Sequence, residues 1–345
     1  MRAGEELDVA KVDAWLRSQV PGLAGAPEVT QYPGGASNWT YRLRYDSLDL
    51  VLRRPPEGTK AKSAHDMGRE HRIQKALRPV FPFVSEMIAF CEDRSVIGCE
   101  FYVMRRLDGV ILRKNPPADL ALTPDQTRQL CLNMVDTLIA LHRVDVRAKG
   151  LEDLGRGAGY TRRQVEGWSD RYRRARTWNV PRFERVMSWL AAHTPDDVAT
   201  CLIHNDFRFD NLVLDQGDPT RIVGVLDWEM ATLGDPLMDL GNALAYWVEA
   251  DDDFFIRSLR RQPTHLPGML TRAEVVEHYA RKTGRRTDNW AFYEAFGLFR
   301  LAAIAQQIYY RYQQGQTRNP AFRNFWLFVS YLGWRCGRVI RRSGP

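Results

Sequence analysis

The chain has 345 residues, 44% of them hydrophobic, which is enough for two folded lobes with sizeable cores and excludes an intrinsically disordered protein. Its formal net charge is +7; of its 49 basic residues seven are Lys and the other 42 are Arg. Because no nucleic-acid-binding motif accompanies this charge, nucleic acid is not an expected partner.

The five cysteines form no closely spaced pair of the metal-binding or redox type, and four of them lie in apolar or helical surroundings. Buried free thiols are therefore expected, as in a reducing compartment. The first residues lack the apolar core of a signal peptide, and no run approaches 18 apolar residues. We therefore expect a cytoplasmic protein without a membrane partner, and the oligomeric state stays open.

The first third of the chain predicts a helix, a series of strands and a second helix. Apolar residues at helical spacing predict the first helix over 7–19. The second helix is expected to open with a capping box of Ser63 and Asp66. Alternating or apolar runs predict five strands, over 29–32, 38–45, 49–54, 87–91 and 100–105.

A glycine-rich turn, residues 33–37, separates the first two strands. Glycines let backbone N–H groups approach phosphate without interference from a Cβ atom. Gly34, Gly35, Ser37 and the following Asn38 are therefore candidate nucleotide-binding residues. A plain hairpin turn is the alternative interpretation.

From residue 106 onward the pattern is mainly helical. A helix capped by Thr123 and Gln126 should end at His142, which we expect to be a packed residue rather than a catalyst. The basic run 171–176 is either a solvated helix face or the entrance for an anionic substrate, and the acidic run 249–253 is expected to be solvated. Further helices are expected over 161–175, 181–192, 271–283, 290–314 and 321–341.

The most informative stretch runs from residue 202 to 228. An apolar run is followed by His204-Asn205-Asp206, and Asn211 lies five residues after Asp206. A second apolar run over 221–226 is followed directly by Asp227. Transfer of a phosphoryl group to a hydroxyl requires a carboxylate near the hydroxyl proton, and an amide and a carboxylate to hold Mg²⁺. The spacing H-x-D-x4-N with a later Asp is the arrangement of kinases.

Two motifs, HNDFRFDN at 204–211 and VLDWEMATLGDPLMDLG at 225–241, resemble those of the aminoglycoside phosphotransferase family, in particular its kinase-like members found alone or fused to acyl-CoA dehydrogenases. The resemblance covers the chain from about residue 29 to the last helix. It implies an α+β, bilobal protein-kinase-like fold. An N-terminal lobe over 1–105 would hold a five-stranded antiparallel sheet and a helix, and a mostly helical lobe would span 106–345.

The resemblance also implies roles for individual residues. Arg53 stands where kinases carry a phosphate-binding Lys, and Glu70 would orient it; Lys60 or Lys62 could take the role of Arg53 instead. Backbone groups of the segment around Met104 and Arg106 would meet the adenine.

In the catalytic stretch, Asp206 would be the base, Arg208 would offset charge on the transferring group, and Asn211 and Asp227 would bind Mg²⁺. His204 would hold the loop. Asp235 and Asp239 would brace the active-site loops through backbone hydrogen bonds.

The function that follows is a Mg²⁺-dependent transfer of phosphoryl from ATP or GTP to a hydroxyl of a small molecule. A hydroxyacyl-CoA, an aminoglycoside and an unidentified alcohol are the candidate acceptors. The first is favoured over the second because the resemblance to the acyl-CoA dehydrogenase-associated members implies it, and many Arg residues suit CoA phosphates. A nucleotide-binding pseudokinase and a metal-dependent hydrolase using His204, Asp206 and Asp227 are the alternatives from other classes.

Overall fold

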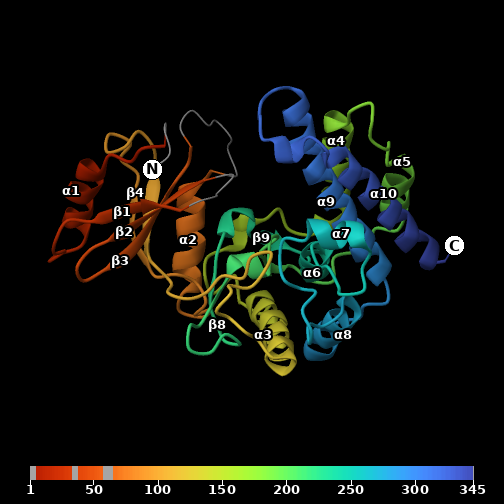
Figure 1. Cartoon of the computed structure of the whole chain (residues 1–345), viewed down its shortest axis with the longest axis horizontal. Coiled ribbons are helices and arrows are strands. Elements are labelled where there is room, and N and C mark those ends of the chain that lie inside the picture. Colours follow the sequence, from red (N-terminus) through yellow and green to blue (C-terminus); the bar gives the residue numbers. More distant parts are fainter. Residues whose placement is uncertain (1–4, 33–37, 57–64, 345) are drawn as a thin grey trace. The chain divides into compact units, whose positions relative to one another are not determined.

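A computed structural model describes residues 5–32, 38–56 and 65–344 (Figure 1). They form two compact units. The first comprises Met1–Ile111, Arg147–Leu151 and Asn211–Met230, and the second comprises Leu112–Val146, Glu152–Asp210 and Ala231–Pro345. The expected lobe boundary between residues 105 and 106 stays a prediction. Several candidate residues lie outside the described part of the chain, namely Gly34, Gly35, Ser37, Lys60, Lys62 and Ser63.

The first unit contains the expected five-stranded antiparallel sheet, whose strand order is β1-β2-β3-β5-β4. The predicted strands all form, with ends that differ by at most one residue. Their bounds are β1 (Glu28–Gln31), β2 (Trp39–Arg44), β3 (Asp49–Arg54), β4 (Met87–Cys91) and β5 (Phe101–Arg105).

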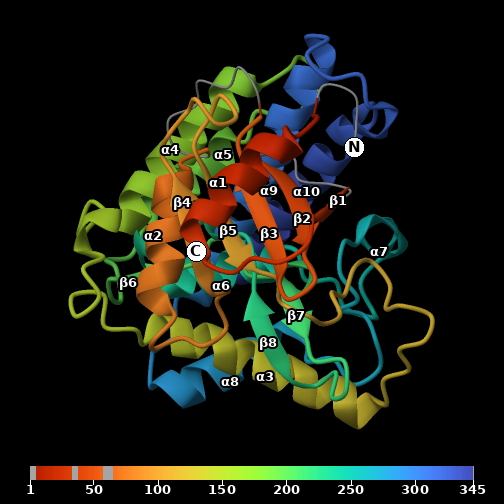
Figure 2. The same cartoon turned by 90° about the vertical axis from the view of Figure 1, so that its left-hand side faces the viewer.

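Two helices, α1 (Val9–Gln19) and α2 (Met67–Leu77), cover opposite faces of this sheet (Figures 1 and 2). Successive strand residues point to opposite faces. Leu50 and Leu52 accordingly pack in the core that contains α1, whereas Val51 packs with Met67 of α2. The α2 helix begins at Met67 because the Asp66 side chain accepts a hydrogen bond from the backbone N–H of Arg69, so Asp66 is the N-cap itself rather than the third residue of a capping box.

Short strands frame the catalytic stretch within each unit. In the first unit β7 (Leu212–Leu214) pairs with β8 (Ile222–Val225), and in the second β6 (Cys201–Ile203) pairs with β9 (Thr232–Gly234). The apolar runs predicted β6 and β8. The other two strands, β7 and β9, were not predicted.

The second unit is mainly helical, as predicted. The capping boxes at Thr123/Gln126 and Thr271/Glu274 are both formed. The helices are α3 (Pro124–His142), α4 (Tyr160–Ala175), α5 (Glu184–Ala192), α6 (Pro236–Ala245), α7 (Phe254–Leu259), α8 (Arg272–Thr283), α9 (Trp290–Gln313) and α10 (Phe325–Arg342).

Two helices begin three or more residues later than predicted, and one short helix was not predicted. The α5 helix begins three residues late because Phe183 has a left-handed backbone, with φ of 58°. The α10 helix begins at Phe325 because the chain first makes a 3₁₀ turn at Pro320–Phe322. The six-residue α7 was not predicted; Asp253 caps it.

The long α9 helix forms the centre of the second unit and packs against α4, α6 and α10. Its crossing with α6 depends on two glycines, since a Cβ atom on Gly297 would lie 2.3 Å from the carbonyl oxygen of Gly241. This close approach fixes α6 and α9 against each other.

The five cysteines are free, and Cys91, Cys131, Cys201 and Cys336 are buried, as predicted. None of the helices in the described ranges is both long and apolar enough to cross a membrane.

Candidate active site

The first unit brings Arg53 on β3 together with three carboxylates. Its Nη1 lies 3.6 Å from Oε2 of Glu70, and its Nη2 lies 3.3 Å from Oδ1 of Asp227 and 3.8 Å from Oε2 of Glu229. The side chain of Arg53 is only 12% exposed. The predicted pairing of Arg53 with Glu70 is thus present, and Arg53 also contacts the predicted metal ligand Asp227.

Glu70 lies on the buried face of α2, where its side chain is 2% exposed. The hydroxyl of Tyr102 donates a hydrogen bond of 2.9 Å to Oε2 of Glu70. Burial raises the pKa of the Glu70 carboxyl, although Arg53 and Tyr102 act in the opposite direction. The guanidinium of Arg53 is therefore the counter-charge that allows an ionised Glu70 in this position.

Asn38 links these carboxylates. Its Nδ2 donates to Glu70 Oε1 at 3.2 Å and to Glu229 Oε2 at 3.1 Å, and its Oδ1 is 3.0 Å from Nδ1 of His65. The side chain of Asn38 is thus committed to ordering the cluster, so a direct contact with nucleotide would have to come from its backbone.

The predicted metal ligands, Asn211 and Asp227, stand at neighbouring ends of the β7–β8 pair. The N–H of Leu226 donates to the carbonyl of Asn211 at 2.8 Å, and Leu212 is paired with Val225. Asp227 follows with a left-handed backbone, φ 67°, and its side chain is 35% exposed.

This donor set suits Mg²⁺, which takes few protein ligands and completes its octahedron with phosphate and water oxygens. Arg53 occupies one oxygen of the Asp227 carboxylate, which leaves the other for a cation. Within the described ranges no group of three or more His, Cys, Asp and Glu residues could hold a metal by itself.

In the segment predicted to contact adenine, some of the groups are already buried or hydrogen-bonded within the protein. Met104 is 7% exposed and packs in the core beneath α2. The backbone N–H of Arg106 donates to the carbonyl of Asp49 at 2.9 Å, and its guanidinium pairs with Asp49 and Asp108. A backbone contact from Arg106 could thus come only from its carbonyl.

In the second unit, the side chain of Asp239 holds the loop that follows β6. Its carboxylate accepts hydrogen bonds from the N–H groups of His204 at 2.8 Å and Asn205 at 2.7 Å. The carboxylate of Asp235 accepts from the N–H groups of Val198, Leu237 and Met238. The expectation that Asp239 braces this loop through backbone N–H groups is confirmed, whereas the hydrogen bonds of Asp235 go to Val198 and to the first turn of α6.

His142 completes the support for Asp239. Its Nε2 is 3.1 Å from Oδ2 of Asp239, and its Nδ1 is 2.8 Å from the hydroxyl of Tyr279. Burial opposes ionisation of Asp239, but His142, His204 and the loop amides together hold the pKa of Asp239 below its ordinary value. His142 is therefore a packed structural residue, as predicted.

Asn205 adopts a left-handed backbone, φ 65°, which turns the chain between His204 and Asp206. Its side-chain oxygen accepts hydrogen bonds from Tyr160 and Asn242, both at 3.2 Å. The next residue, Asp206, donates its N–H to Nδ1 of His204 at 3.3 Å. These contacts fix the direction in which the Asp206 side chain leaves the loop.

The two predicted catalytic side chains are brought together. Nε of Arg208 lies 3.2 Å from Oδ1 of Asp206, and its Nη2 lies 3.3 Å from Oδ2 of Asp210. The guanidinium also stacks 4.5 Å above the ring of Tyr246. Burial raises the pKa of Asp210. The predicted base, Asp206, and Arg208 therefore form one cluster with Asp210 and Tyr246.

The acidic run 249–253 is not simply solvated, contrary to our expectation. Arg272 makes two contacts with Asp252, at 2.7 and 3.0 Å, and another with Glu249 at 3.0 Å. Glu249 and Asp252 are consequently engaged by a cation of α8 and do not offer a free acidic pocket.

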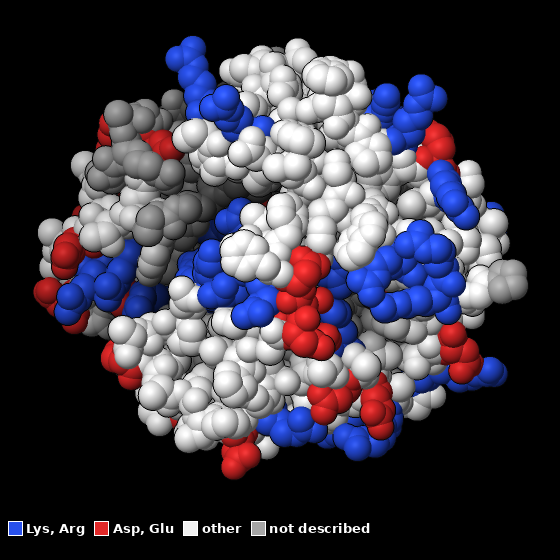
Figure 3. All heavy atoms as spheres, turned by 45° about the vertical axis from the view of Figure 1, so that its right-hand side comes forward, with Lys and Arg blue, Asp and Glu red and all other residues white. Residues whose placement is uncertain are grey.

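The arginines of the basic run 171–176 lie in different environments. Arg173 is solvated and pairs with Glu184 at 2.8 Å, as expected of a helix face, whereas Arg171 lies 4.5 Å above the ring of Trp168. On the face shown in Figure 3, Lys and Arg side chains gather in groups, with acidic side chains clustered between two of them.

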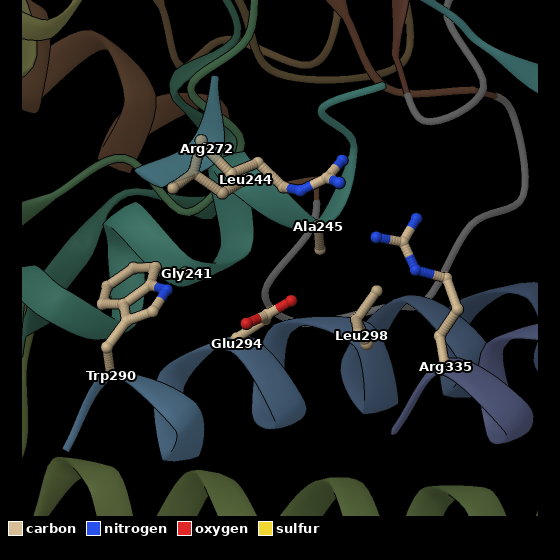
Figure 4. A pocket seen from close by; sticks show the side chains of 8 residues that line it. All are labelled: Gly241, Leu244, Ala245, Arg272, Trp290, Glu294, Leu298 and Arg335. Carbon is tan, nitrogen blue, oxygen red and sulfur yellow. The ribbon is translucent and has the colours of Figure 1, made fainter. Parts of the chain in front are cut away.

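A small pocket opens between α6, α9 and α10 (Figure 4). Arg272 and Arg335 extend into it opposite Glu294 and Trp290. Because it contains none of the residues predicted for nucleotide, metal or catalysis, it is separate from the candidate site.

Several residues of the site were not predicted. Glu229 joins Arg53 and Asn38, and its position directly after Asp227-Trp228 is the signal that could have identified it. Asn242 and Tyr246 lie in and just after α6, beyond the end of the motif at 225–241, and only the folded chain brings them to the loop.

Solved structures of phosphotransferases share this fold. A Ralstonia eutropha protein, provisionally assigned as an aminoglycoside phosphotransferase, is 32% identical with a TM-score of 0.81, and the match covers 96% of this chain and 99% of that one. A thermostable mutant of aminoglycoside phosphotransferase APH(4)-Ia, in ternary complex with AMP-PNP and hygromycin B, shares the fold at 15% identity, with a TM-score of 0.58 and coverage of 97% and 98%. The fold is thus the predicted kinase-like one.

The chain belongs to the phosphotransferase enzyme family, whose model matches residues 28–275. Among curated proteins, mouse (Mus musculus) acyl-CoA dehydrogenase family member 10 is 38% identical over 295 residues, which cover 85% of this chain and 27% of the mouse protein. The chain spans less than half the length of the curated relatives it matches. The predicted family and the predicted phosphotransferase class are confirmed.

Proposed function

We propose that the protein transfers the γ-phosphoryl group of ATP or GTP to a hydroxyl of a small molecule in a Mg²⁺-dependent reaction. The observation that carries this proposal is the buried contact of Arg53 with both Glu70 and Asp227. In a kinase-like site one cation binds the phosphates, one carboxylate orients it and one carboxylate holds the metal. The three side chains fill these roles.

The residues of the first unit would hold the nucleotide. Arg53 would bind the α- and β-phosphates, because its planar guanidinium can contact two oxygens and stays charged. Asn211 and Asp227 would hold Mg²⁺, which supplies positive charge next to the phosphate oxygens. The glycine-rich segment 33–37 would cover the phosphates through backbone N–H groups.

The residues of the second unit would act on the acceptor. The acceptor oxygen forms a bond to the γ-phosphorus as the bond between that phosphorus and the bridging oxygen of the β-phosphate breaks, and ADP or GDP leaves. The proton of the hydroxyl passes to the carboxylate of Asp206. Arg208 pairs with Asp206 and offsets charge near the transferring group.

A hydroxyacyl-CoA is the favoured acceptor. Mouse acyl-CoA dehydrogenase family member 10 is 38% identical to this chain, whereas APH(4)-Ia, which binds the aminoglycoside hygromycin B, is only 15% identical. The one acidic run that could have attracted a cationic aminoglycoside is engaged by Arg272. A cytoplasmic location, in keeping with the free thiols, is part of the proposal.

A screen tests the proposal directly. Hydroxyacyl-CoAs, aminoglycosides and other alcohols are offered with MgATP or MgGTP, and acceptor-dependent release of ADP or GDP is measured. Nucleotide binding without release in the presence of any acceptor would indicate a pseudokinase. Cleavage of phosphate esters without nucleotide would indicate a hydrolase instead.

A further inference from the structure

Arg300 on α9 is a buried cation without a buried anion to match it. Arg300 is only 5% exposed, and its Nη2 donates a hydrogen bond of 3.2 Å to the backbone carbonyl of Asn205. Within the described part of the chain, no carboxylate lies at ion-pairing distance from this guanidinium. A buried charge is costly unless it is paired, so this arrangement points to a partner from outside the chain.

A second guanidinium stands beside the first. Both Arg300 and Arg171 contact the indole ring of Trp168, with guanidinium carbons 5.3 and 4.5 Å from the ring centre. Burial and the nearby charges of Arg174 and Arg300 lower the pKa of Arg171. Two like charges sharing one ring repel each other, and an anion between or above them would relieve that repulsion.

Asp170, whose charge acts on Arg171, lies 3.9 Å from Arg173 and is exposed, and the carboxylates of the catalytic loop region are already engaged. Asp206 pairs with Arg208, and Asp239 binds His142 and two loop amides. Arg300 therefore keeps an unmatched positive charge directly beside the catalytic loop. The carbonyl that it contacts is bonded to the peptide nitrogen of Asp206, so this charge lies one residue from the proposed base.

We propose that Arg300, Arg171 and Trp168 form an anion subsite for the acceptor. This inference rests on the proposed function and narrows its substrate class: the acceptor carries an anionic group that reaches these guanidinium groups, either a carboxylate or a phosphate such as those of CoA. The indole holds the two guanidinium groups in place, and Arg300 couples the bound anion to the loop that carries Asp206. A cationic acceptor is disfavoured at this subsite by the same charges.

Inorganic sulfate is the probe for the subsite. Calorimetric titration is carried out on the full chain with MgAMP-PNP present, so that nucleotide phosphates occupy their own site. We expect Arg300→Gln to weaken sulfate binding at least tenfold, and Arg171→Gln and Trp168→Phe to weaken it several-fold. Arg311→Gln is the matched control, because Arg311 is an exposed arginine of the same helix, and its sulfate affinity should not change.

Two further variants and probes separate a binding role from a structural one. Arg300→Lys keeps the charge and should retain part of the sulfate affinity, whereas a purely structural arginine would show no such rescue. Displacement of sulfate by a short hydroxycarboxylate or by an alcohol phosphate distinguishes the two sources of the anion. Arg171→Gln removes the more exposed guanidinium and tests the subsite even if Arg300→Gln does not fold.

The outcomes are distinguishable from those of the acceptor screen, because sulfate binding requires no turnover. Equal sulfate affinity in the wild type, Arg300→Gln and Arg171→Gln would overturn the anion subsite while leaving phosphoryl transfer intact. Loss of sulfate binding in these variants, in a protein that releases no ADP or GDP with any acceptor, would support the subsite and remove the proposed reaction.

Discussion

Nη2 of Arg53 donates a hydrogen bond to Oδ1 of Asp227 across 3.3 Å. The proposed phosphate-binding cation and the proposed metal ligand are therefore in direct contact. Nη1 of the same guanidinium faces Glu70, and Glu229 lies 3.8 Å away, so one arginine is shared by three carboxylates. Any change of Arg53 should alter metal binding as well as phosphate binding.

We predict that Arg53→Ala is more damaging than Arg53→Lys. Lysine keeps a positive charge but loses the bidentate contact with the phosphate oxygens. We therefore expect a higher KM for nucleotide and partly retained activity. Alanine leaves three carboxylates facing the phosphates, and we expect a loss of at least 100-fold in kcat/KM, or about 3 kcal/mol. Glu70→Ala should cost less, because only the orientation of the cation is lost.

The double variant Arg53→Ala/Glu70→Ala provides the control. Residues that act as one unit give effects that are less than additive, so the double variant should resemble Arg53→Ala. A mild Arg53→Ala together with a severe Lys60→Ala or Lys62→Ala would transfer the phosphate-binding role to that lysine.

Much of the sheet was predictable because its strands carry their own signal. Residues 49–54 and 87–91 combine apolar, β-branched and aromatic side chains, and both strands end where predicted. Helices that begin with a capping box, such as α3 and α8, were equally predictable from the sequence. The start of α5 was not, because the left-handed backbone of Phe183 is imposed by its packing against Tyr172 and Phe299 rather than by its own preference.

The candidate site was predictable where residues follow a motif. His204, Asp206, Asn211 and Asp227 were placed by their spacing, and Arg53 by its position at a strand end. Arg300 could not be found in this way, because it lies 94 residues beyond Asp206 on a helix whose other side chains are mostly core. Tertiary packing alone brings it to the catalytic loop.

Asp227→Ala should abolish Mg²⁺-dependent binding of nucleotide. The carboxylate is the principal hard-oxygen charge of the proposed metal site, and Mg²⁺ is held mainly by carboxylate and phosphate oxygens. Calorimetry with AMP-PNP in the presence and absence of Mg²⁺ measures the effect, and the metal-dependent part should disappear. Asp215→Ala serves as control, since Asp215 is a partly exposed residue of the β7–β8 turn that pairs with Arg221. Unchanged Mg-nucleotide affinity in Asp227→Ala would remove the metal from this position.

Asp239→Asn should destabilise the protein in a pH-dependent manner. The folded chain holds the pKa of Asp239 below 3.8, so its ionised form contributes stability above that pH and the contribution is lost as pH falls further. The asparagine variant should therefore be about 2–5 kcal/mol less stable near neutral pH. The difference from the wild type should narrow below pH 3.8. Chemical unfolding at several pH values measures it, and a difference independent of pH would show that Asp239 acts by shape alone.

Asp206→Asn should abolish phosphoryl transfer while leaving nucleotide binding nearly unchanged. Asparagine preserves the shape of the side chain but cannot accept the hydroxyl proton, and general-base assistance is worth on the order of 10²–10⁴ in rate. We therefore expect kcat to fall by that factor, with the affinity for MgAMP-PNP within about threefold of the wild type. Asp210→Asn is the matched control, because Asp210 contacts the same Arg208 but has no predicted contact with the acceptor. If the two variants lost equal activity, or if Asp206→Asn retained activity within a few-fold of the wild type, the base would have to be sought elsewhere.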